Sequence, residues 1–461
     1  MDRILGYIEN NKERYLNELK ELLSIPSIST DDGHNPDVQK CARWIADHLA
    51  GVGMKNTQIF QTKGHPIVYS EWLEAPGAPT VLFYGHYDVQ PVDPIELWTS
   101  PPFQPTVRGD NIYARGSADD KGQIFIHFKS VEAFLKNKGK LPLNIKMIIE
   151  GEEEIGSNNL ETFIEEHCSK LQADLALISD TSMYGKGIPS VCYGLRGISY
   201  MQIEVTGPNR DLHSGSYGGS VHNPIQALAE MIAGLHDKRG RVTIPGFYES
   251  VRKLGAEERK AFKKLPWNNK EYAKNLGVRK LYGEGDFTTL ERIWTRPTVE
   301  CNGIWGGFIS EGAKTVLPSK AYAKISMRLV PDQEAETIAK LFEKQIKKAA
   351  PRTVQVDVRY IHGGEAIVTP LKSAGVRAAA KALEKGFGKK PVYQREGGSI
   401  PIVVEFKKRL GLDTVLLGFG LPDENAHAPD EYLNLGNFYA GIRTMTHFYN
   451  ELPAQMRNGK K

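Results

Sequence analysis

Histidine, aspartate and glutamate residues follow several short apolar segments of this 461-residue chain, at the point where each segment ends. His86 and Asp88 follow the segment Thr80–Tyr84, and Asp180 follows the segment Asp174–Ile178. Imidazole nitrogens and carboxylate oxygens are ligands for divalent cations, and uncompensated carboxylates at the rim of one sheet would repel one another. The pattern therefore predicts a metal site. The same arrangement recurs at three further places, which are Asp119-Asp120, Glu150-Gly151-Glu152-Glu153-Glu154, and Leu421–Asp430 with His427.

Each of these features also has an ordinary structural explanation when it is taken alone. The segment 86–88 could form a capped turn, Asp119-Asp120 could cap the N-terminus of a helix, and the glutamates at 152–154 could lie in a solvated loop. Five such features at successive strand ends favour one shared explanation, a metal site. The histidines without this context are expected to be structural or surface residues, namely His34, His48, His65, His127, His167, His236 and His447.

The elements that must position these residues are predicted from the apolar pattern. Helices are predicted over 3–25, 36–51 and 120–136, and buried strands over 80–84, 143–149, 174–178 and 414–417. Apolar strands that alternate with helices predict an α/β fold, with a mixed, mostly parallel sheet and helices on both faces. In such folds ligands bind beyond the carboxyl ends of the strands, which is where the candidate ligands stand.

A different pattern begins near Arg196 and predicts a second domain. Three segments, 198–205, 321–330 and 354–360, alternate as strands with one solvated face do, and helices are predicted near 222–237 and 333–349. We therefore expect an α+β domain at 196–367, inserted into a discontinuous domain formed by 1–195 and 368–461. The Lys- and Glu-rich stretch 250–281 is predicted to be a solvated helical insertion rather than a binding patch.

The overall composition excludes several other classes of protein. The 59 Lys and Arg residues nearly balance the 55 Asp and Glu residues, so the net charge of +4 does not indicate a nucleic-acid partner or a membrane surface. No apolar run approaches the ~20 residues that span a bilayer. Charges interrupt the N-terminal segment, which lacks the apolar region of a secretory signal. The cysteines form no CxxC pair, and we expect a cytoplasmic protein; they are Cys41, Cys168, Cys192 and Cys301.

The ordered motifs are similar to those of a known family. HYDV at 86–89, GSADDKG at 116–122, EGEEEIGS at 150–157, the aspartate after LALIS and the late His427 resemble the two-metal aminoacylase/carboxypeptidase/carnosinase family. The best match is its cytosolic non-specific dipeptidase and carnosinase branch, and the resemblance covers nearly the whole chain. It implies a zinc-peptidase-like catalytic domain, with the inserted domain acting as a lid and dimerisation domain.

The resemblance also implies two divalent metal ions per subunit, zinc or manganese, with cobalt possible. The implied ligands are Asp119 as a bridge, His86 and Asp180 for one ion, and Glu154 and His427 for the other. The implied reaction is amide hydrolysis of dipeptides or short peptides with a free C-terminal carboxylate, by a metal-bridging hydroxide.

The resemblance assigns roles to residues beside these ligands. Glu153 would be the general base, and Asp88 would orient the His86 ring through its second nitrogen. A cis peptide bond between Asp119 and Asp120 is implied as well. Together with the five implied ligands, these residues form the predicted active site of the metal-binding domain.

The inserted domain is implied to supply residues for the substrate. His213, in the motif Asp211–Gly215, would enter the active site of the partner subunit of a homodimer and stabilise the oxyanion. The implied substrate-binding residues include Arg328, whose guanidinium suits a carboxylate, and Glu396, which could receive the free α-amino group. The remaining positions of this group are His362, Ser399 and Thr315.

Two alternatives remain open at this point. An N-acyl amino acid amidohydrolase, a desuccinylase or a carboxypeptidase would share the metal site and differ in the pocket. A non-catalytic binding or scaffold protein would have lost a ligand or the base, and none of those residues is missing from this chain. The sequence does not distinguish zinc from manganese or cobalt, because mixed nitrogen and oxygen ligands suit all three.

Overall fold

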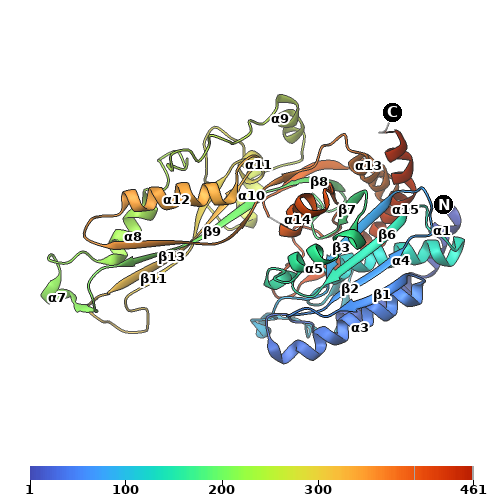
Figure 1. Cartoon of the computed structure of the whole chain (residues 1–461), viewed down its shortest axis with the longest axis horizontal. Coiled ribbons are helices and arrows are strands. Elements are labelled where there is room, and N and C mark those ends of the chain that lie inside the picture. The colour runs from blue at the N-terminus through green and yellow to red at the C-terminus, as the bar shows by residue number, and fades with distance from the viewer. Residues whose placement is uncertain (399, 459–461) are drawn as a thin grey trace. The chain divides into compact units, whose positions relative to one another are not determined.

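The computed structural model describes residues 1–398 and 400–458, and the chain divides into two compact units. Unit 1 consists of Met1–Tyr193, Thr369–Gln394 and Glu405–Lys461. Unit 2 consists of Gly194–Val368 and Arg395–Val404. Segments from both ends of the chain therefore build unit 1, and in Figure 1 the blue N-terminal helices lie beside the red C-terminal helix.

A mixed β-sheet forms the centre of unit 1, in the order β1-β2-β6-β3-β7-β17-β8. The four strands β6, β3, β7 and β17 pair in parallel, whereas β1, β2 and β8 are antiparallel to their neighbours. The central strands are apolar on both faces, and six of the seven residues of β3 are buried. The bounds are β1 Lys55–Phe60, β2 Ile67–Trp72, β3 Thr80–His86, β6 Asn144–Glu150, β7 Leu175–Ile178, β8 Ser190–Leu195 and β17 Thr414–Leu416.

Helices cover both faces of this sheet, as the apolar strands predict. Six helices pack with one face in the main core: α1 Asp2–Asn10, α2 Lys12–Leu23, α3 Asn35–Val52, α4 Lys121–Lys138, α13 Ala374–Phe387 and α15 Leu435–Asn458. The opposite face of the sheet contacts three further helices: α5 Leu160–Glu166, α6 Cys168–Leu171 and α14 Pro401–Leu410. The predicted α/β fold with a mixed sheet is thus confirmed.

The N-terminal helix predicted over 3–25 is two helices, with a break at Asn11. The backbone of Asn11 leaves the helical region at φ −113°, and its side-chain amide donates a hydrogen bond to the Tyr7 carbonyl at 2.7 Å. Asparagine side chains compete with backbone hydrogen bonds in this way, which explains the interruption. The apolar residues of both helices still face the core.

Short elements complete unit 1. A three-stranded sheet, β18-β5-β4, joins the segment before α4 to the segment before α15. Its strands are β4 Thr106–Arg108, β5 Asn111–Tyr113 and β18 Tyr432–Asn434. Three 3₁₀ turns are η1 Asp32–His34, η2 Ile95–Leu97 and η3 Glu153–Ile155.

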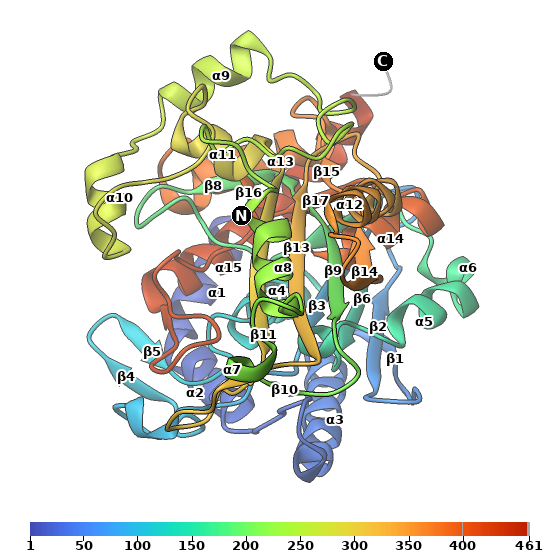
Figure 2. The same ribbon diagram turned by 90° about the vertical axis from the view of Figure 1, so that its left-hand side faces the viewer.

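Unit 2 is built on a four-stranded antiparallel sheet in the order β11-β13-β9-β14. Burial alternates along β9, and the residues that face α8 and α12 form the core of this unit. Figure 2, like Figure 1, shows both helices on the same side of the sheet. The elements are β9 Gly197–Thr206, α8 Pro224–Ala233, β11 Thr298–Gly306, β13 Lys320–Leu329, α12 Ala335–Ala349 and β14 Gln355–Gly364.

The remaining elements of unit 2 are short. A two-stranded ladder pairs β10 (Leu212–His213) with β12 (Val316–Leu317), and α7 (Ser214–Tyr217) follows the first of them. The predicted insertion forms α9 Ala256–Lys263, α10 Asn269–Asn275 and, just beyond it, α11 Thr289–Thr295. Two strands adjoin β8. They are β15 Ile367–Val368, which belongs to unit 2, and β16 Val392–Glu396, whose first three residues belong to unit 1.

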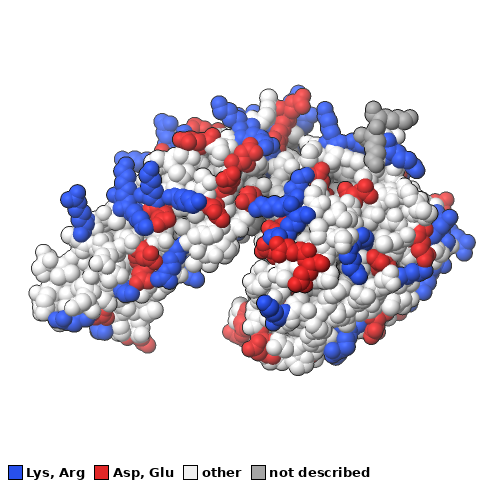
Figure 3. Space-filling view, viewed as in Figure 1, with Lys and Arg blue, Asp and Glu red and all other residues white. Residues whose placement is uncertain are grey.

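Positive and negative side chains are interspersed over the face drawn in Figure 3. This surface agrees with the near balance of charges in the sequence. Within the described residues, no helix is long and apolar enough to cross a membrane.

Candidate metal centre

The structure brings the five predicted ligands together at one edge of the unit 1 sheet. His86 is the last residue of β3, and Asp180 stands two residues beyond β7, its parallel neighbour. Glu154 lies in η3, a short turn beyond the end of β6, the other parallel neighbour of β3. Asp119 precedes α4, and His427 comes from the loop after β17. Parallel strands end at the same edge, so residues far apart in the chain meet there.

Asp119 lies at the centre of this arrangement. Its Oδ1 is 3.0 Å from Nε2 of His86, and its Oδ2 is 2.9 Å from Nε2 of His427. Glu154 Oε2 is 3.2 Å from the same His427 nitrogen, and Asp180 Oδ2 is 4.0 Å from the His86 nitrogen. The residues thus form two groups that share Asp119, and within each group the ligand atoms all lie within 4.8 Å of one another.

The charges of these side chains fit divalent cations. Burial, together with the charge of Asp119, raises the pKa of Asp180 to about 7. Hydrogen bonds to Asp119 and Glu154 raise the pKa of His427 to about 10. Burial opposes ionisation of Asp119, but hydrogen bonds from both histidines hold its pKa below the usual value. Carboxylates so close together need positive charge, and a cation can supply it in place of imidazolium protons.

The His86 ring is oriented for ligation by Asp88, which is fully buried. Nδ1 of His86 lies 3.2 Å from the Asp88 carbonyl oxygen and 3.3 Å from its carboxylate, so this nitrogen donates its proton there. The Asp88 carboxylate also accepts the backbone N–H groups of Glu153, at 3.2 Å, and Glu154, at 3.0 Å. One buried carboxylate therefore fixes the ring and the turn, so that Nε2 of His86 faces the site and could bind a cation once its proton is displaced.

Glu153 has the surroundings of a proton acceptor with an elevated pKa. Burial raises its pKa well above the usual value, the nearby charges of Asp180 and Asp119 raise it further, and His86 opposes them. A carboxyl group whose pKa is raised in this way can serve as a general base and acid. The peptide bond between Asp119 and Asp120 is cis, which confirms that prediction.

The sequence predictions did not include two residues that contact the candidate ligands. Gln90 donates its side-chain amide to Glu154 Oε2 at 2.7 Å. Glu431 accepts backbone N–H groups of Gly116 at 2.9 Å, Ala118 at 2.8 Å and Asp119 at 3.1 Å. Glu431 stands four residues after His427, and this short separation was the signal that the sequence offered for it.

Two predicted substrate residues of unit 2 lie together on the β10–β12 ladder. Thr315 Oγ1 lies 3.5 Å from Nε2 of His213, and both residues are exposed. Nδ1 of His213 accepts the backbone N–H groups of Gly215 at 3.0 Å and Ser216 at 3.3 Å. Since Nδ1 is an acceptor, the ring proton of neutral His213 is on Nε2.

Two others lie on the sheet of unit 2. Arg328 is in β13 opposite Ile198 of β9, and His362 is in β14 opposite Tyr200. The His362 and Tyr200 rings stack with centroids 5.3 Å apart. The predicted residue Glu396 ends β16, and Ser399 lies outside the described residues.

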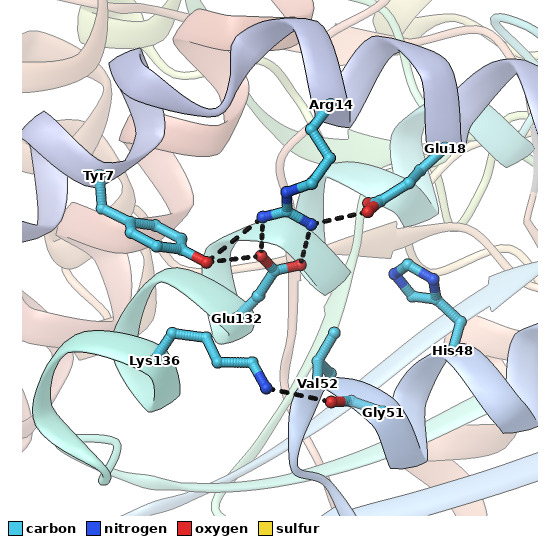
Figure 4. Close-up of a pocket in the computed structure, with 8 residues that line it drawn as sticks. All are labelled: Tyr7, Arg14, Glu18, His48, Gly51, Val52, Glu132 and Lys136. Atoms are coloured by element: carbon cyan, nitrogen blue, oxygen red, sulfur yellow. Dashed lines mark hydrogen bonds and ion pairs between the residues drawn. The ribbon is translucent and has the colours of Figure 1, made fainter.

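A third group of ligand-type side chains lies among the N-terminal helices and is already neutralised. Ligand atoms of Glu18, His48 and Glu132 lie within 4.8 Å of one another, around a pocket of about 360 Å³. The Lys129 ammonium is 2.9 Å from His48 Nε2 and 2.8 Å from Glu132, and it also pairs with Glu18. In Figure 4, Arg14 bridges the two glutamates. Two cations thus occupy this cluster, so we assign no metal to it.

Comparisons with known proteins agree on one family. A family model described as peptidase family M20/M25/M40 matches residues 82–451. The Cys-Gly metallodipeptidase dug1 of Schizosaccharomyces pombe is 32% identical over 467 residues, which cover 98% of each chain. The structure of human carnosine dipeptidase 1 is 29% identical, with a TM-score of 0.85 and 98% of each chain covered. The M20 family metallo-carboxypeptidase Sso-CP2 of Sulfolobus solfataricus is 35% identical, with a TM-score of 0.87, covering 95% of this chain and 99% of the other.

Proposed function

The chain belongs to peptidase family M20/M25/M40, as its motifs predict, and on this premise we propose that it is a two-metal dipeptidase. It hydrolyses the amide bond of dipeptides or short peptides that carry a free C-terminal carboxylate. The observation that carries the proposal is the pair of ligand groups sharing Asp119, with Glu153 beside them. The similarity to a Cys-Gly metallodipeptidase and to a carnosine dipeptidase supports the same substrate class.

In this proposal, two divalent ions are held by the two groups of ligands. His86, Asp119 and Asp180 hold one ion, and Asp119, Glu154 and His427 hold the other. When bound, such ions polarise the scissile carbonyl and make a water acidic enough to act as a nucleophile at neutral pH. Zinc, manganese and cobalt all match this donor set.

Residues of the chain then transfer the proton and hold the reacting groups in position. Glu153 accepts the proton of the attacking water on its carboxylate and delivers it to the nitrogen of the leaving amine. Its buried position favours the protonated state that this transfer requires. Asp88 holds the backbone of Glu153 and the His86 ring, so that base and ligand keep a fixed relation.

We propose further that the protein is a homodimer and that His213 acts in the active site of its partner. The arrangement of His213 supports this role, because the ring is exposed and two backbone N–H groups occupy Nδ1. The proton on Nε2 is then available to stabilise an oxyanion by a hydrogen bond. Thr315, beside Nε2, belongs to the same proposed surface.

The free carboxylate of the substrate is assigned to unit 2. Arg328 provides a guanidinium fork for it, and His362 a neutral ring, since burial and the charge of Arg328 lower the pKa of His362. Glu396 is proposed to receive the α-amino group, and Ser399 is proposed to contact the carboxylate. We also propose a cytoplasmic location, which the four free cysteines support.

A carboxypeptidase is the second candidate, because the Sulfolobus metallo-carboxypeptidase is 35% identical to this chain. It would use the same metal ligands and the same carboxylate-binding residues, and would accept longer peptides. N-acyl amino acid hydrolysis and desuccinylation require the same metal ligands with another acyl pocket.

A substrate panel tests these functions directly. The protein is loaded with zinc, manganese or cobalt and offered dipeptides, tripeptides, longer peptides, N-acetyl amino acids and N-succinyl amino acids. We expect the highest kcat/KM for dipeptides. A preference for longer peptides would favour the carboxypeptidase, and a preference for acylated amino acids would overturn the peptidase proposal.

A further inference from the structure

Unit 2 contains a pocket of about 400 Å³ whose charged side chains are mainly arginines. It lies where the strands β11 and β13 adjoin α11. The charged side chains carry four positive and two negative charges, and this excess favours an anionic ligand. They are Arg196, Arg292, Arg296, Arg328, Glu284 and Glu300.

Two of these arginines are held by the wall of the pocket. Arg296 forms two hydrogen bonds with the Glu284 carboxylate, at 2.9 and 3.2 Å. Arg292 donates to the backbone carbonyls of Glu284, at 2.7 Å, and Tyr282, at 3.2 Å. The buried carboxylate of Glu284 is therefore engaged by Arg296.

Arg196 stands directly before β9 and is held by the loop that follows β16. Its backbone N–H donates to the Gly398 carbonyl, and its side-chain Nε donates to the Gly397 carbonyl, both at 3.1 Å. A Cβ atom at residue 397 would lie 2.9 Å from Nη2 of Arg196, so glycine there makes room for the guanidinium. Within the described residues Arg196 forms no ion pair, and the bond through Nε leaves both Nη groups for a ligand.

Arg196 and Arg328 are close enough to affect each other. Burial, together with the charge of Arg328, lowers the pKa of Arg196 to about 10, while the charge of Glu300 opposes this shift. Burial also lowers the pKa of Arg328. Two like charges in a partly buried pocket repel each other, and an anionic ligand between them lowers that repulsion. A carboxylate has two oxygens and can accept hydrogen bonds from two guanidinium groups at once.

We propose that Arg196 and Arg328 form a two-guanidinium site for the C-terminal carboxylate of the substrate. This inference rests on the proposed function, which assigns that carboxylate to Arg328, His362 and Ser399 and gives Arg196 no role. Arg196 is then a specificity-determining residue, because it makes the site select a carboxylate over an uncharged chain end. Gly397 is a positioning residue that gives the Arg196 guanidinium its place.

The test compares a substrate that carries the carboxylate with one that lacks it. Ala-Gly and Ala-Gly amide are given to the metal-loaded wild type and to Arg196→Met. We expect kcat/KM for Ala-Gly to fall at least about 30-fold in the variant, and kcat/KM for the amide to change less than about threefold. Gly397→Ala leaves both arginines in the chain but displaces the Arg196 guanidinium. It should therefore also lower the ratio of kcat/KM for Ala-Gly to kcat/KM for the amide.

Arg292→Met is the matched control. It removes an arginine from the same pocket whose hydrogen bonds go to backbone carbonyls, so it should keep the wild-type ratio of the two substrates. An equal loss for both substrates in Arg196→Met, or an unchanged ratio, would overturn the proposed site. That outcome would leave the dipeptidase function standing, because the wild type still cleaves Ala-Gly.

A binding measurement keeps the proposed site testable even if the proposed function fails. Calorimetric titration of Ala-Gly and its amide into metal-loaded Glu153→Gln, with and without Arg196→Met, reports affinity without turnover. If the wild type cleaves neither compound, the proposed function fails. Arg196-dependent binding of Ala-Gly would then still support the carboxylate site, and binding that ignores Arg196 would overturn it.

Discussion

The carboxylate of Glu431 accepts the backbone N–H of Asp119 at 3.1 Å, across 312 positions of the chain. The same carboxylate accepts the N–H groups of Gly116 and Ala118 and pairs with Arg115 at 2.8 Å. Asp119 is the residue that both ligand groups share. The C-terminal segment that carries His427 therefore also fixes the loop that presents the central ligand.

Glu431→Gln should weaken metal binding without removing any ligand. The amide keeps one acceptor oxygen but places an N–H₂ group against backbone donors, so the Asp119 loop loses its fixed orientation. Residues that orient ligands typically change metal affinity by about 10- to 100-fold, and a competition titration against a chelator measures that loss. Glu384→Gln, at an exposed position on α13, is the control. Unchanged affinity in a folded Glu431→Gln protein would contradict the positioning role.

Glu153→Gln tests the proposed general base. The amide cannot accept the proton of water, so we expect kcat for a dipeptide to fall by about 10²- to 10⁴-fold. Metal content should stay at the wild-type value, because Glu153 belongs to neither ligand group. Elemental analysis and steady-state kinetics measure both quantities, with Glu166→Gln on exposed α5 as the control. Near-wild-type turnover of the metal-loaded variant would show that another group is the base.

The proximity of the candidate ligands could be predicted from the sequence because most of them lie just after a strand or just before a helix. His86, Asp180 and Glu154 come after strands whose apolar composition is plain, and parallel pairing brings such ends together. The family resemblance supplied the pairing of ligands with each ion. The grouping of these side chains in the structure agrees with that pairing, while the roles of the residues stay proposals.

Other features depend on tertiary contacts that leave no local pattern. Asn11 interrupts a continuous amphipathic segment through one side-chain hydrogen bond, which periodicity does not register. Arg196 resembles any arginine before a strand until the Gly397 loop is placed against it. Lys129 lies fully buried within α4, where its ammonium meets side chains from two other helices.

Subunit mixing tests whether His213 acts in the partner's active site. In a heterodimer of His213→Ala and Glu153→Gln, one site combines an intact Glu153 with an intact His213 from the other subunit. Random exchange makes half the dimers mixed, so about a quarter of the wild-type activity should return from two inactive parents. Native mass spectrometry verifies the exchange. No recovery after verified exchange would contradict a role in trans.

His127 should make the stability of unit 1 depend on pH. Ser179 Oγ donates to the Leu417 carbonyl and so accepts from His127 Nε2, while Tyr449 donates to Nδ1. The ring is therefore neutral, and burial lowers its pKa to about 3. Since the folded pKa is below the unfolded value of about 6.5, the unfolded chain binds the extra proton. The contribution of His127 to the free energy of unfolding is therefore fully present above about pH 6.5 and is lost as the pH falls toward 3.

His127→Gln removes this titration. Between pH 7.5 and pH 5 the free energy of unfolding of the wild type should fall by about 2 kcal/mol more than that of the variant. Urea unfolding of both proteins across this range measures the difference, with His34→Gln at the surface as the control. Parallel pH profiles for wild type and His127→Gln would show that the ring does not stay neutral in the folded state.

Lys129→Met should convert the ion-pair cluster of the N-terminal helices into a metal site. The Lys129 ammonium contacts Glu18, His48 and Glu132, which are the three ligand-type residues of that group. Without the Lys129 ammonium, Arg14 is the remaining cation beside the carboxylates of Glu18 and Glu132. Removing one partner of a buried ion pair typically costs about 3–5 kcal/mol of stability. Thermal unfolding should therefore shift to lower temperature in metal-free buffer.

Zinc should restore part of the stability lost in Lys129→Met, because the vacated position lies among one imidazole and two carboxylates. We expect zinc to raise the melting temperature of the variant by more than that of the wild type, with one more ion bound per chain. Lys136→Met is the matched control, since Lys136 lines the same pocket but donates only to the exposed Gly51 carbonyl at 3.2 Å (Figure 4). A variant that is destabilised but binds no additional zinc would show that Arg14 and the remaining side chains close over the vacated position.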